Sequence, residues 1–358
     1  MRITSLQAIA VADRLSGPAL SLLAAINVLF VAVVLGTAFA AGARAETLPA
    51  CQGRNLLESL KADEPGTYAD ILAAGEATIN GDTLLFRIER DGLAPSHVFG
   101  TMHMTDPRVT ELPPAAAEAF DAARTVAIET TEILDPQQAQ TALLSKPELT
   151  MFTGTGRLSD FLDDADRQVL KDGLAERGLQ LALIDRMKPW LVAGMVALPE
   201  CETARKQAGA QILDIALAMR AKAEGKRLVG LETMVEQLEA MASLPMAFHV
   251  KGLVETVALG AMIDDINETM VMLYDQGRIG LVWPVLRAMA PAAAGDDVGY
   301  AEFERTMVNA RNRTMAERAM PLIEQGGAFI AVGALHLPGE EGVPELLARA
   351  GYQVTPVR

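Results

Sequence analysis

The chain has 358 residues and a formal net charge of −15, and half of its residues are hydrophobic. A chain of this length has ample apolar surface to bury in a full core. Its acidic balance, without any run of lysine or arginine, excludes the basic footprint that a nucleic-acid-binding protein needs. Aromatic residues make up only 4%, so the 17 methionines predict a core packed by aliphatic and methionine side chains.

The N-terminal segment has the pattern of an export signal. Arg2 and Arg14 precede a stretch without charge over residues 15–43, and Ala43-Arg44-Ala45 follows. A basic start, an apolar run and a small-x-small site predict that residues 1–45 form a signal peptide. The run is also long enough to span a bilayer, so an uncleaved N-terminal anchor, the only membrane contact expected, stays open. Either alternative places residues 46–358 outside the cytoplasm, in the periplasm or cell envelope.

The sequence contains two cysteines, Cys51 and Cys201. In an oxidising compartment, such a pair predicts one disulfide that joins the start of the exported chain to its middle. Two buried free thiols are the alternative. Neither cysteine has a histidine near it in the sequence, so we assign neither a metal-binding nor a nucleophilic role.

Apolar runs alternate with helical patterns along residues 46–358. The strand predictions are residues 83–90, 96–99, 125–128, 227–231, 329–332 and 352–356. The helix predictions are residues 55–61, 68–76, 114–123, 212–223, 234–241 and 343–350. This alternation predicts an α/β fold with a central, mostly parallel sheet flanked by helices. Because no repeat or low-complexity linker interrupts the segment, we expect a single domain, with helical insertions near residues 160–219 and 245–274.

Polar side chains follow four of the predicted strands. Glu129 and Glu232 come directly after residues 125–128 and 227–231, and His103 and His336 follow residues 96–99 and 329–332 in Gly-x-x-His segments. Ligands of open α/β sheets bind at the carboxyl ends of the strands. Two imidazoles with one or two carboxylates form the ligand set of a catalytic divalent metal. Such a metal activates water, which predicts hydrolysis.

Each of these residues also has a plainer interpretation. A histidine after a strand is commonly a structural hydrogen-bonding group, and a glutamate there can favour the N-terminus of the next helix. We interpret the other two histidines, His97 and His249, as structural. The glycines that begin the two segments, Gly100 and Gly333, would allow backbone to approach a ligand closely. The sequence has no Gly-x-Ser-x-Gly elbow, P-loop or strand-linked Gly-x-Gly-x-x-Gly motif.

At these positions the sequence resembles the TraB/PrgY/GumN family, which is related to the Tiki proteases. The matching segments are Phe99-Gly100-Thr101-Met102-His103, Ala127-Ile128-Glu129-Thr130, Lys188-Pro189-Trp190, Gly230-Leu231-Glu232-Thr233, Glu236-Gln237, Arg311-Asn312, Gly333-Ala334-Leu335-His336-Leu337-Pro338-Gly339 and Gly351-Tyr352. Their order and spacing over roughly 260 residues make the resemblance specific.

The resemblance implies a fold like that of the erythromycin-esterase and ChaN-like proteins. Tiki relatives are metal-dependent proteases supported by Mn²⁺ or Co²⁺. Carried over to this chain, His103 and His336 would bind the metal, and Glu129 would bind it or act as general base. Glu232 is the other candidate for a catalytic carboxylate. Arg311 would stabilise a developing oxyanion.

We therefore predict an exported metal-dependent hydrolase, a metallopeptidase that acts on a peptide or protein with Mn, Co or Zn as its divalent metal. Two alternatives stay open. One is a non-enzymatic envelope protein that binds a peptide, haem or metal in the same cleft. The other is an esterase of the erythromycin-esterase type, in which a histidine acts as base without a metal.

Overall fold

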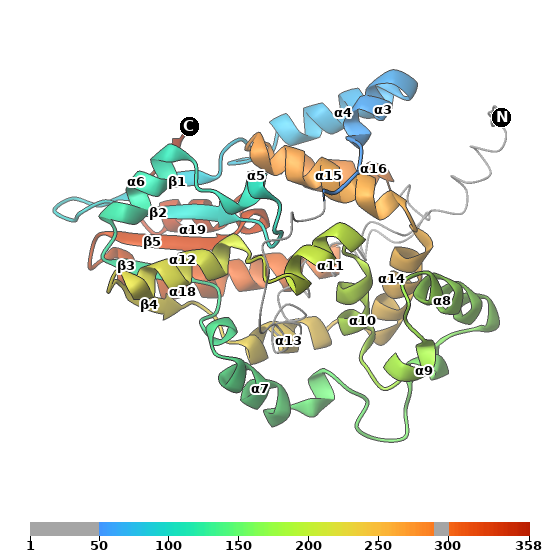
Figure 1. Ribbon diagram of the computed structural model, residues 1–358. Coiled ribbons are helices and arrows are strands. Elements are labelled where there is room, and N and C mark those ends of the chain that lie inside the picture. The colour runs from blue at the N-terminus through green and yellow to red at the C-terminus, as the bar shows by residue number, and fades with distance from the viewer. Residues whose placement is uncertain (1–49, 290–300) are drawn as a thin grey trace.

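The computed structural model describes residues 50–289 and 301–358 (Figure 1). The predicted signal peptide or anchor, residues 1–45, lies outside the described residues. In the described part, six strands form one sheet, in the order β4-β3-β5-β2-β1-β6. The strands are β1 (Leu85–Glu89), β2 (Ser96–Thr101), β3 (Thr125–Ile128), β4 (Arg227–Gly230), β5 (Ala328–Gly333) and β6 (Gln353–Val357).

The centre of the sheet is parallel. Strand β5 pairs in parallel with β2 on one side and with β3 on the other, and β3 pairs in parallel with β4. Strand β1 is antiparallel to both of its neighbours, β2 and β6. The prediction of an α/β fold with a mostly parallel sheet is therefore confirmed, and each predicted strand is present within a few residues of its expected bounds.

Helices connect the strands and form most of the remaining structure. Before β3 they are α3 (Leu56–Asp63), α4 (Pro65–Glu76), α5 (Pro107–Thr110) and α6 (Pro114–Ala122). Between β3 and β4 they are η2 (Glu132–Leu134), α7 (Pro136–Ser145), η3 (Pro147–Leu149), η4 (Leu158–Phe161), α8 (Asp164–Glu176), α9 (Leu181–Ile184), α10 (Pro189–Val196), α11 (Glu200–Gln207) and α12 (Leu213–Ala223).

Between β4 and β5 lie α13 (Met234–Ala242), α14 (Met246–Ala258), α15 (Met262–Asp275), η5 (Ile279–Leu281), α16 (Val282–Met289), the π-helical segment η6 (Glu304–Asn309) and α18 (Ala310–Ile323). After β5 come η7 (Ala334–His336) and α19 (Val343–Arg349).

Local sequence signals set several helix ends. Helix α13 begins with a capping box, in which Thr233 and Glu236 exchange hydrogen bonds between their side chains and backbone N–H groups. Helix α19 is followed by Gly351, whose φ of 90° suits the left-handed conformation that glycine adopts without a steric penalty. The stop predicted at this glycine is confirmed.

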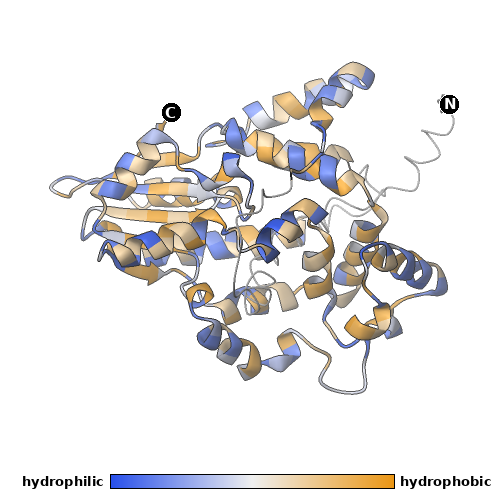
Figure 2. Ribbon diagram, in the orientation of Figure 1, coloured by the Kyte–Doolittle hydropathy of each residue, from blue (hydrophilic) through white to orange (hydrophobic). Residues whose placement is uncertain are grey.

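Two apolar cores hold the molecule together. One surrounds the sheet, where the ring of Phe120 on α6 packs edge-on against Phe329 of β5 at 5.4 Å between centroids. The other lies among the helices of the two predicted insertions and includes Trp190 of α10 and Leu253 of α14. Figure 2 shows the hydrophobic strands of the sheet and the apolar faces of these helices. Much of the predicted insertions thus packs helix on helix.

Within the described residues, no single helix is long and apolar enough to cross a membrane. Helices α14 and α15, which meet at a bend of 100°, satisfy the length and composition criteria only when taken as a pair.

Candidate active site

Four neighbouring strands end at one edge of the sheet and deliver the predicted polar residues there. Along the order β4, β3, β5 and β2, the strands are followed by Glu232, Glu129, His336 and His103. The β3–β4 pairing extends beyond the strands, since the N–H of Glu232 donates to the carbonyl of Glu129 at 2.7 Å. All four side chains are buried. The sheet thus places the residues that the sequence singled out side by side.

The two motif glycines are needed for close packing at this edge. A Cβ atom on Gly333 would lie 3.1 Å from Glu129 Oε1 and 3.5 Å from His336 Cδ2. A Cβ atom on Gly100 would lie 2.6 Å from the side chain of Leu337 and 3.0 Å from the backbone of Ala334. Glycine therefore leaves room for the carboxylate beside β5 and for η7 against β2.

Neighbouring groups fix the His336 ring and its tautomer. Asn312 Nδ2 donates to the carbonyl of Glu341 at 2.7 Å, which turns Asn312 Oδ1 toward His336 Nδ1, 2.6 Å away. Nδ1 must then carry the proton, so the lone pair of the neutral ring lies on Nε2. Burial, together with Arg311 nearby, lowers the pKa of His336 to about 3. The ring is consequently neutral at physiological pH, and the lone pair of Nε2 is available to bind a metal ion.

Glu129 is held by donors on several sides. Its Oε1 accepts from the N–H of Gly333 at 2.7 Å, and its Oε2 accepts from Arg311 Nη2 at 2.7 Å and from Gln237 Nε2 at 3.1 Å. Burial raises the pKa of Glu129, but Arg311 and the two histidines outweigh burial and lower it to about 2. Glu129 is therefore an ionised carboxylate, with Oε1 3.8 Å from His336 Nε2.

Glu232 and Arg311 form a buried ion pair next to Glu129. Arg311 Nε lies 3.1 Å from both oxygens of Glu232, and Arg311 Nη2 lies 2.7 Å from Glu232 Oε2. The two glutamates raise the pKa of Arg311 beyond its ordinary value although burial opposes this. The guanidinium thus bridges Glu129 and Glu232.

His103 faces a carboxylate that the sequence did not single out. Its Nε2 lies 3.6 Å from Oδ1 of Asp214, in the first turn of α12, and Asp214 is only 1% exposed. Burial alone would lower the pKa of His103, but the charge of Asp214 outweighs burial and raises it. The two Gly-x-x-His histidines therefore differ, since a charged oxygen faces His103 and a neutral amide oxygen holds His336.

A cavity of about 70 Å³ lies among these groups. His103, Glu129 and His336 all line it, and Tyr274, whose hydroxyl donates to the carbonyl of Gly100 at 2.8 Å, contributes to its wall. The remaining lining residues are Thr101, Met102, Met270, Ile279, Val282, Val308, Gly333, Ala334 and Leu335. The volume is enough for a small ion or a few water molecules.

The donors around this cavity are of the kinds that a divalent ion takes. Within residues 50–289 and 301–358, no three His, Cys, Asp or Glu side chains are grouped as a ready-made metal centre. The histidines instead form two nitrogen–oxygen pairs, His103 with Asp214 and His336 with Glu129. Imidazole and carboxylate donors suit Mn²⁺, Co²⁺ or Zn²⁺.

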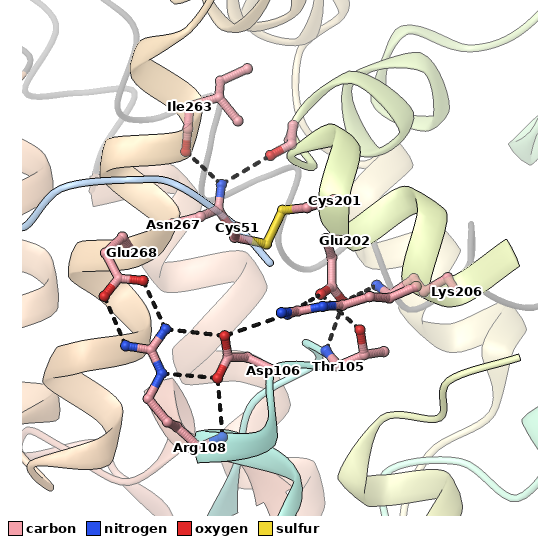
Figure 3. The surroundings of a disulfide bond; sticks show 12 residues. Cys51, Thr105, Asp106, Arg108, Cys201, Glu202, Lys206, Ile263, Asn267 and Glu268 are labelled. Carbon is pink, nitrogen blue, oxygen red and sulfur yellow. Dashed lines mark hydrogen bonds and ion pairs between the residues drawn. A yellow bond between two sulfur atoms is a disulfide. The ribbon is translucent and has the colours of Figure 1, made fainter. Parts of the chain in front are cut away.

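The loop that carries His103 is clamped to α11. The carboxylate of Glu202 accepts from the N–H of Thr105 at 2.7 Å and from its hydroxyl at 2.8 Å, and Glu202 is fully buried. Lys206, one turn further along α11, donates to the carbonyl of His103 at 3.3 Å. These contacts, several of which Figure 3 shows, fix the loop where it leaves β2.

The predicted disulfide is present next to this clamp. Cys51 and Cys201 are bonded, with their Cα atoms 5.3 Å apart and 150 residues apart in sequence. Cys201 precedes Glu202 on α11, so the disulfide ties residue 51 to the helix that holds the His103 loop (Figure 3).

A large groove borders the other side of α11. Its volume is about 960 Å³, and its wall includes Leu134, Met195, Ile215 and Met219 together with Lys206. Met195 and Met219 are exposed.

Sequence reasoning missed several groups of the site. Asp214 stands alone as a charged residue among Ile212, Leu213 and Ile215, and these apolar neighbours are the signal that could have identified it. Asn312 and Gln237 lie within motif segments, but their contacts with His336 and Glu129 depend on helix positions that spacing does not reveal. His249 is a packing residue, as expected: it lies against Trp190 and its Nε2 is 2.9 Å from the Met241 carbonyl.

The protein is thus an α/β protein that carries buried imidazole–carboxylate pairs at the carboxyl edge of its parallel strands. Residues 84–356 match the TraB/PrgY/gumN family, and the chain belongs to that family. It is also similar to the Metalloprotease TIKI1 of Danio rerio, with 24% identity over 322 residues, covering 76% of this chain and 63% of that protein. The chain thus spans less than two thirds of this relative's length. No solved structure matches the chain.

Proposed function

We propose that this protein is an exported metal-dependent hydrolase that cleaves peptides. The observation that carries the proposal is the convergence of both Gly-x-x-His histidines and Glu129 on one buried cavity. The similarity to a protein named as a metalloprotease supports the same chemistry, and the family membership is consistent with it.

The charges around the cavity favour a bound cation. Three carboxylates, Glu129, Glu232 and Asp214, are buried here, and one buried guanidinium, that of Arg311, pairs with the first two. With both histidines neutral, as binding a metal requires, this leaves an excess of two negative charges, which a divalent ion would balance. Buried charges without such compensation are strongly destabilising.

His103, His336 and Glu129 would hold the ion. A divalent metal in such a site lowers the pKa of a bound water and polarises a carbonyl. His336 offers Nε2 because Asn312 holds the proton on Nδ1. A pKa of about 2 makes the carboxylate of Glu129 a weak base, so its charge suits binding a cation better than taking a proton.

The carboxylate of Glu232 and the guanidinium of Arg311 would act indirectly, by holding Glu129 in place. Both oxygens of Glu232 bind Arg311, which in turn orients Glu129. A general-base role for Glu232 and an oxyanion-stabilising role for Arg311 would each require these buried bonds to rearrange. We therefore assign both residues primarily to positioning Glu129.

Export and a peptide substrate are supported by two further features. Disulfides persist in oxidising compartments such as the periplasm, in agreement with the N-terminal signal pattern. The groove beside α11 offers an apolar wall adjacent to the His103 loop, as an extended peptide substrate would require.

Metal content and activity together test the proposal. The full chain, purified in mild detergent, should bind a divalent ion and cleave unstructured peptides in the presence of Mn²⁺. His336→Ala should lower metal affinity at least about tenfold and abolish cleavage. His97→Ala is the matched control, because His97 is a half-buried strand histidine outside the cavity lining.

Other results would select the alternatives. Metal content that is the same in wild type, His103→Ala and His336→Ala would contradict a metal site at these histidines. Binding of a peptide or haem without cleavage would identify a non-enzymatic binding protein. Cleavage that resists chelators would favour a metal-free esterase-type mechanism with a histidine base.

A further inference from the structure

Among the described residues, the carboxylate of Asp214 is buried beside His103 and pairs with neither an arginine nor a lysine. Within the described residues, Glu129 and Glu232 pair with Arg311, and Glu202 pairs with Lys206. Asp214 forms its ion pair with His103, at 3.6 Å, which is longer than a direct hydrogen bond. An acid that is 1% exposed is thus left with an imidazole as its counterpart.

One oxygen of this carboxylate accepts a hydrogen bond from a protein side chain and the other does not. Thr101 Oγ1 donates to Asp214 Oδ1 at 2.8 Å, and both residues are buried. Asp214 Oδ2 is also buried and has no hydrogen-bond partner among the described residues. Leaving a buried charged acceptor without a hydrogen-bond partner is strongly unfavourable, more so than for a neutral group. A group outside the polypeptide that binds this oxygen would remove that cost.

The distances suit two ligands of one cation. Ligands at about 2.1 Å from a tetrahedral ion lie about 3.4 Å apart. The nitrogen–oxygen separations are 3.6 Å in the His103–Asp214 pair and 3.8 Å in the His336–Glu129 pair. Both values exceed a hydrogen bond and are close to a ligand–ligand separation. Each Gly-x-x-His histidine therefore has a carboxylate beside it at about the separation of two ligands. In the His103 pair the nearer oxygen is Oδ1, and the unpartnered Oδ2 belongs to the same carboxylate.

We propose that Asp214 is a ligand of the divalent cation, bound through its Oδ2 alongside His103. This inference rests on the proposed metal-dependent function and adds a ligand from α12. The site would then contain two imidazoles and two carboxylates, one carboxylate with each histidine. Two carboxylate charges balance a divalent ion, and carboxylate oxygens favour ions such as Mn²⁺ and Co²⁺.

The competing role for Asp214 is purely orienting. A carboxylate that only accepts a hydrogen bond from His103 would fix the ring without touching the ion, as carboxylates that hydrogen-bond to metal-binding histidines do. The two roles differ in one testable respect, because only a ligand touches the ion.

Titration with Co²⁺ alone, followed by its visible absorption, tests the proposal on the full chain in mild detergent. Asp214→Asn keeps an oxygen for the Thr101 hydroxyl but removes the charge, and should weaken Co²⁺ binding at least tenfold with a changed spectrum. Asp214→Cys should give a near-ultraviolet thiolate-to-cobalt charge-transfer band, because a sulfur at this position would contact the ion.

Asp185→Asn is the matched control. Asp185 is a mostly buried aspartate that likewise accepts from a hydroxyl, that of Ser159 at 3.1 Å, and it should bind Co²⁺ as wild type does. Thermal melting of the metal-free proteins identifies any variant that fails to fold.

Two results would overturn the proposal, and they are distinguishable. Wild-type Co²⁺ affinity in Asp214→Asn, with no charge-transfer band in a folded Asp214→Cys, would remove Asp214 from the ligands while leaving a metal site at the histidines. Absence of Co²⁺ binding by the wild-type protein would overturn both this assignment and the metal-dependent function.

Discussion

The buried bridge made by Arg311 predicts a large and pH-dependent loss of stability when it is removed. Arg311→Met keeps the length and apolar stem of the side chain but leaves Glu129 and Glu232 buried without their guanidinium. Breaking a buried ion pair from one side costs about 3–5 kcal/mol. The variant should still fold, because domains of this kind are stable by about 5–15 kcal/mol.

The pKa of Glu129 gives an independent magnitude. A difference of one pKa unit corresponds to about 1.4 kcal/mol. The pKa of Glu129 falls from its ordinary 4.5 to about 2, which contributes about 3 kcal/mol at neutral pH. Because the pKa is depressed in the folded state, this stabilisation is present above about pH 4.5 and is lost as the pH falls toward 2. The deficit of Arg311→Met should therefore be full at pH 7 and shrink below pH 4.5.

Urea denaturation of the metal-free protein, followed by tryptophan fluorescence, measures this deficit. Arg318→Met is the matched control on the same helix, since Arg318 pairs with Glu236 at the surface and such pairs contribute at most about 1 kcal/mol. A deficit for Arg311→Met below about 1 kcal/mol at pH 7, or one that stays constant down to pH 3, would refute the reasoning.

Three further predictions concern the disulfide, the glycine beside the cavity and the amide behind one histidine. Replacing both cysteines by serine should lower the free energy of unfolding by up to about 5 kcal/mol, because the bond closes a loop of about 150 residues; equal urea midpoints for reduced and oxidised protein would contradict this. Gly333→Ala should weaken Co²⁺ binding by about tenfold, because its Cβ would lie 3.1 Å from Glu129 Oε1; unchanged affinity would mean that the carboxylate shifts freely. Asn312→Leu should weaken Co²⁺ binding about 10–100-fold, because the proton of His336 would no longer be held on Nδ1. Wild-type affinity in this variant would exclude a role for Asn312 in orienting His336.

The sequence predicted the strands and the sheet edge of the site well, because both depend on local patterns. Buried strands are short apolar runs, and each of the four predicted parallel ones is followed by its polar residue within four positions of its end. Their neighbour order could not be predicted in the same way. Strand β1 runs opposite to β2 and β6, and its pairing with β6, which joins residues as far apart as Leu85 and Val357, leaves no mark in the local pattern.

The side chains that complete the site were harder to predict. Asp214, Asn312 and Gln237 all come from helices, where a polar residue usually faces solvent. Whether such a residue turns inward depends on how its helix packs against the sheet, which is a tertiary property. Asp214 could have been suspected from its apolar neighbours, whereas Asn312 shows its role only through its hydrogen bond with the ring of His336.

The bond between Cys51 and Cys201 also has a consequence for the timing of assembly. Thiols stay reduced in the cytoplasm and are oxidised after export. In the exported protein that we propose, helix α11 would receive its covalent anchor only after the chain has left the cytoplasm, and α11 is the helix that holds the His103 loop through Glu202 and Lys206. Before such export the chain would lack this anchor, so oxidation would act as the last step in maturing the site.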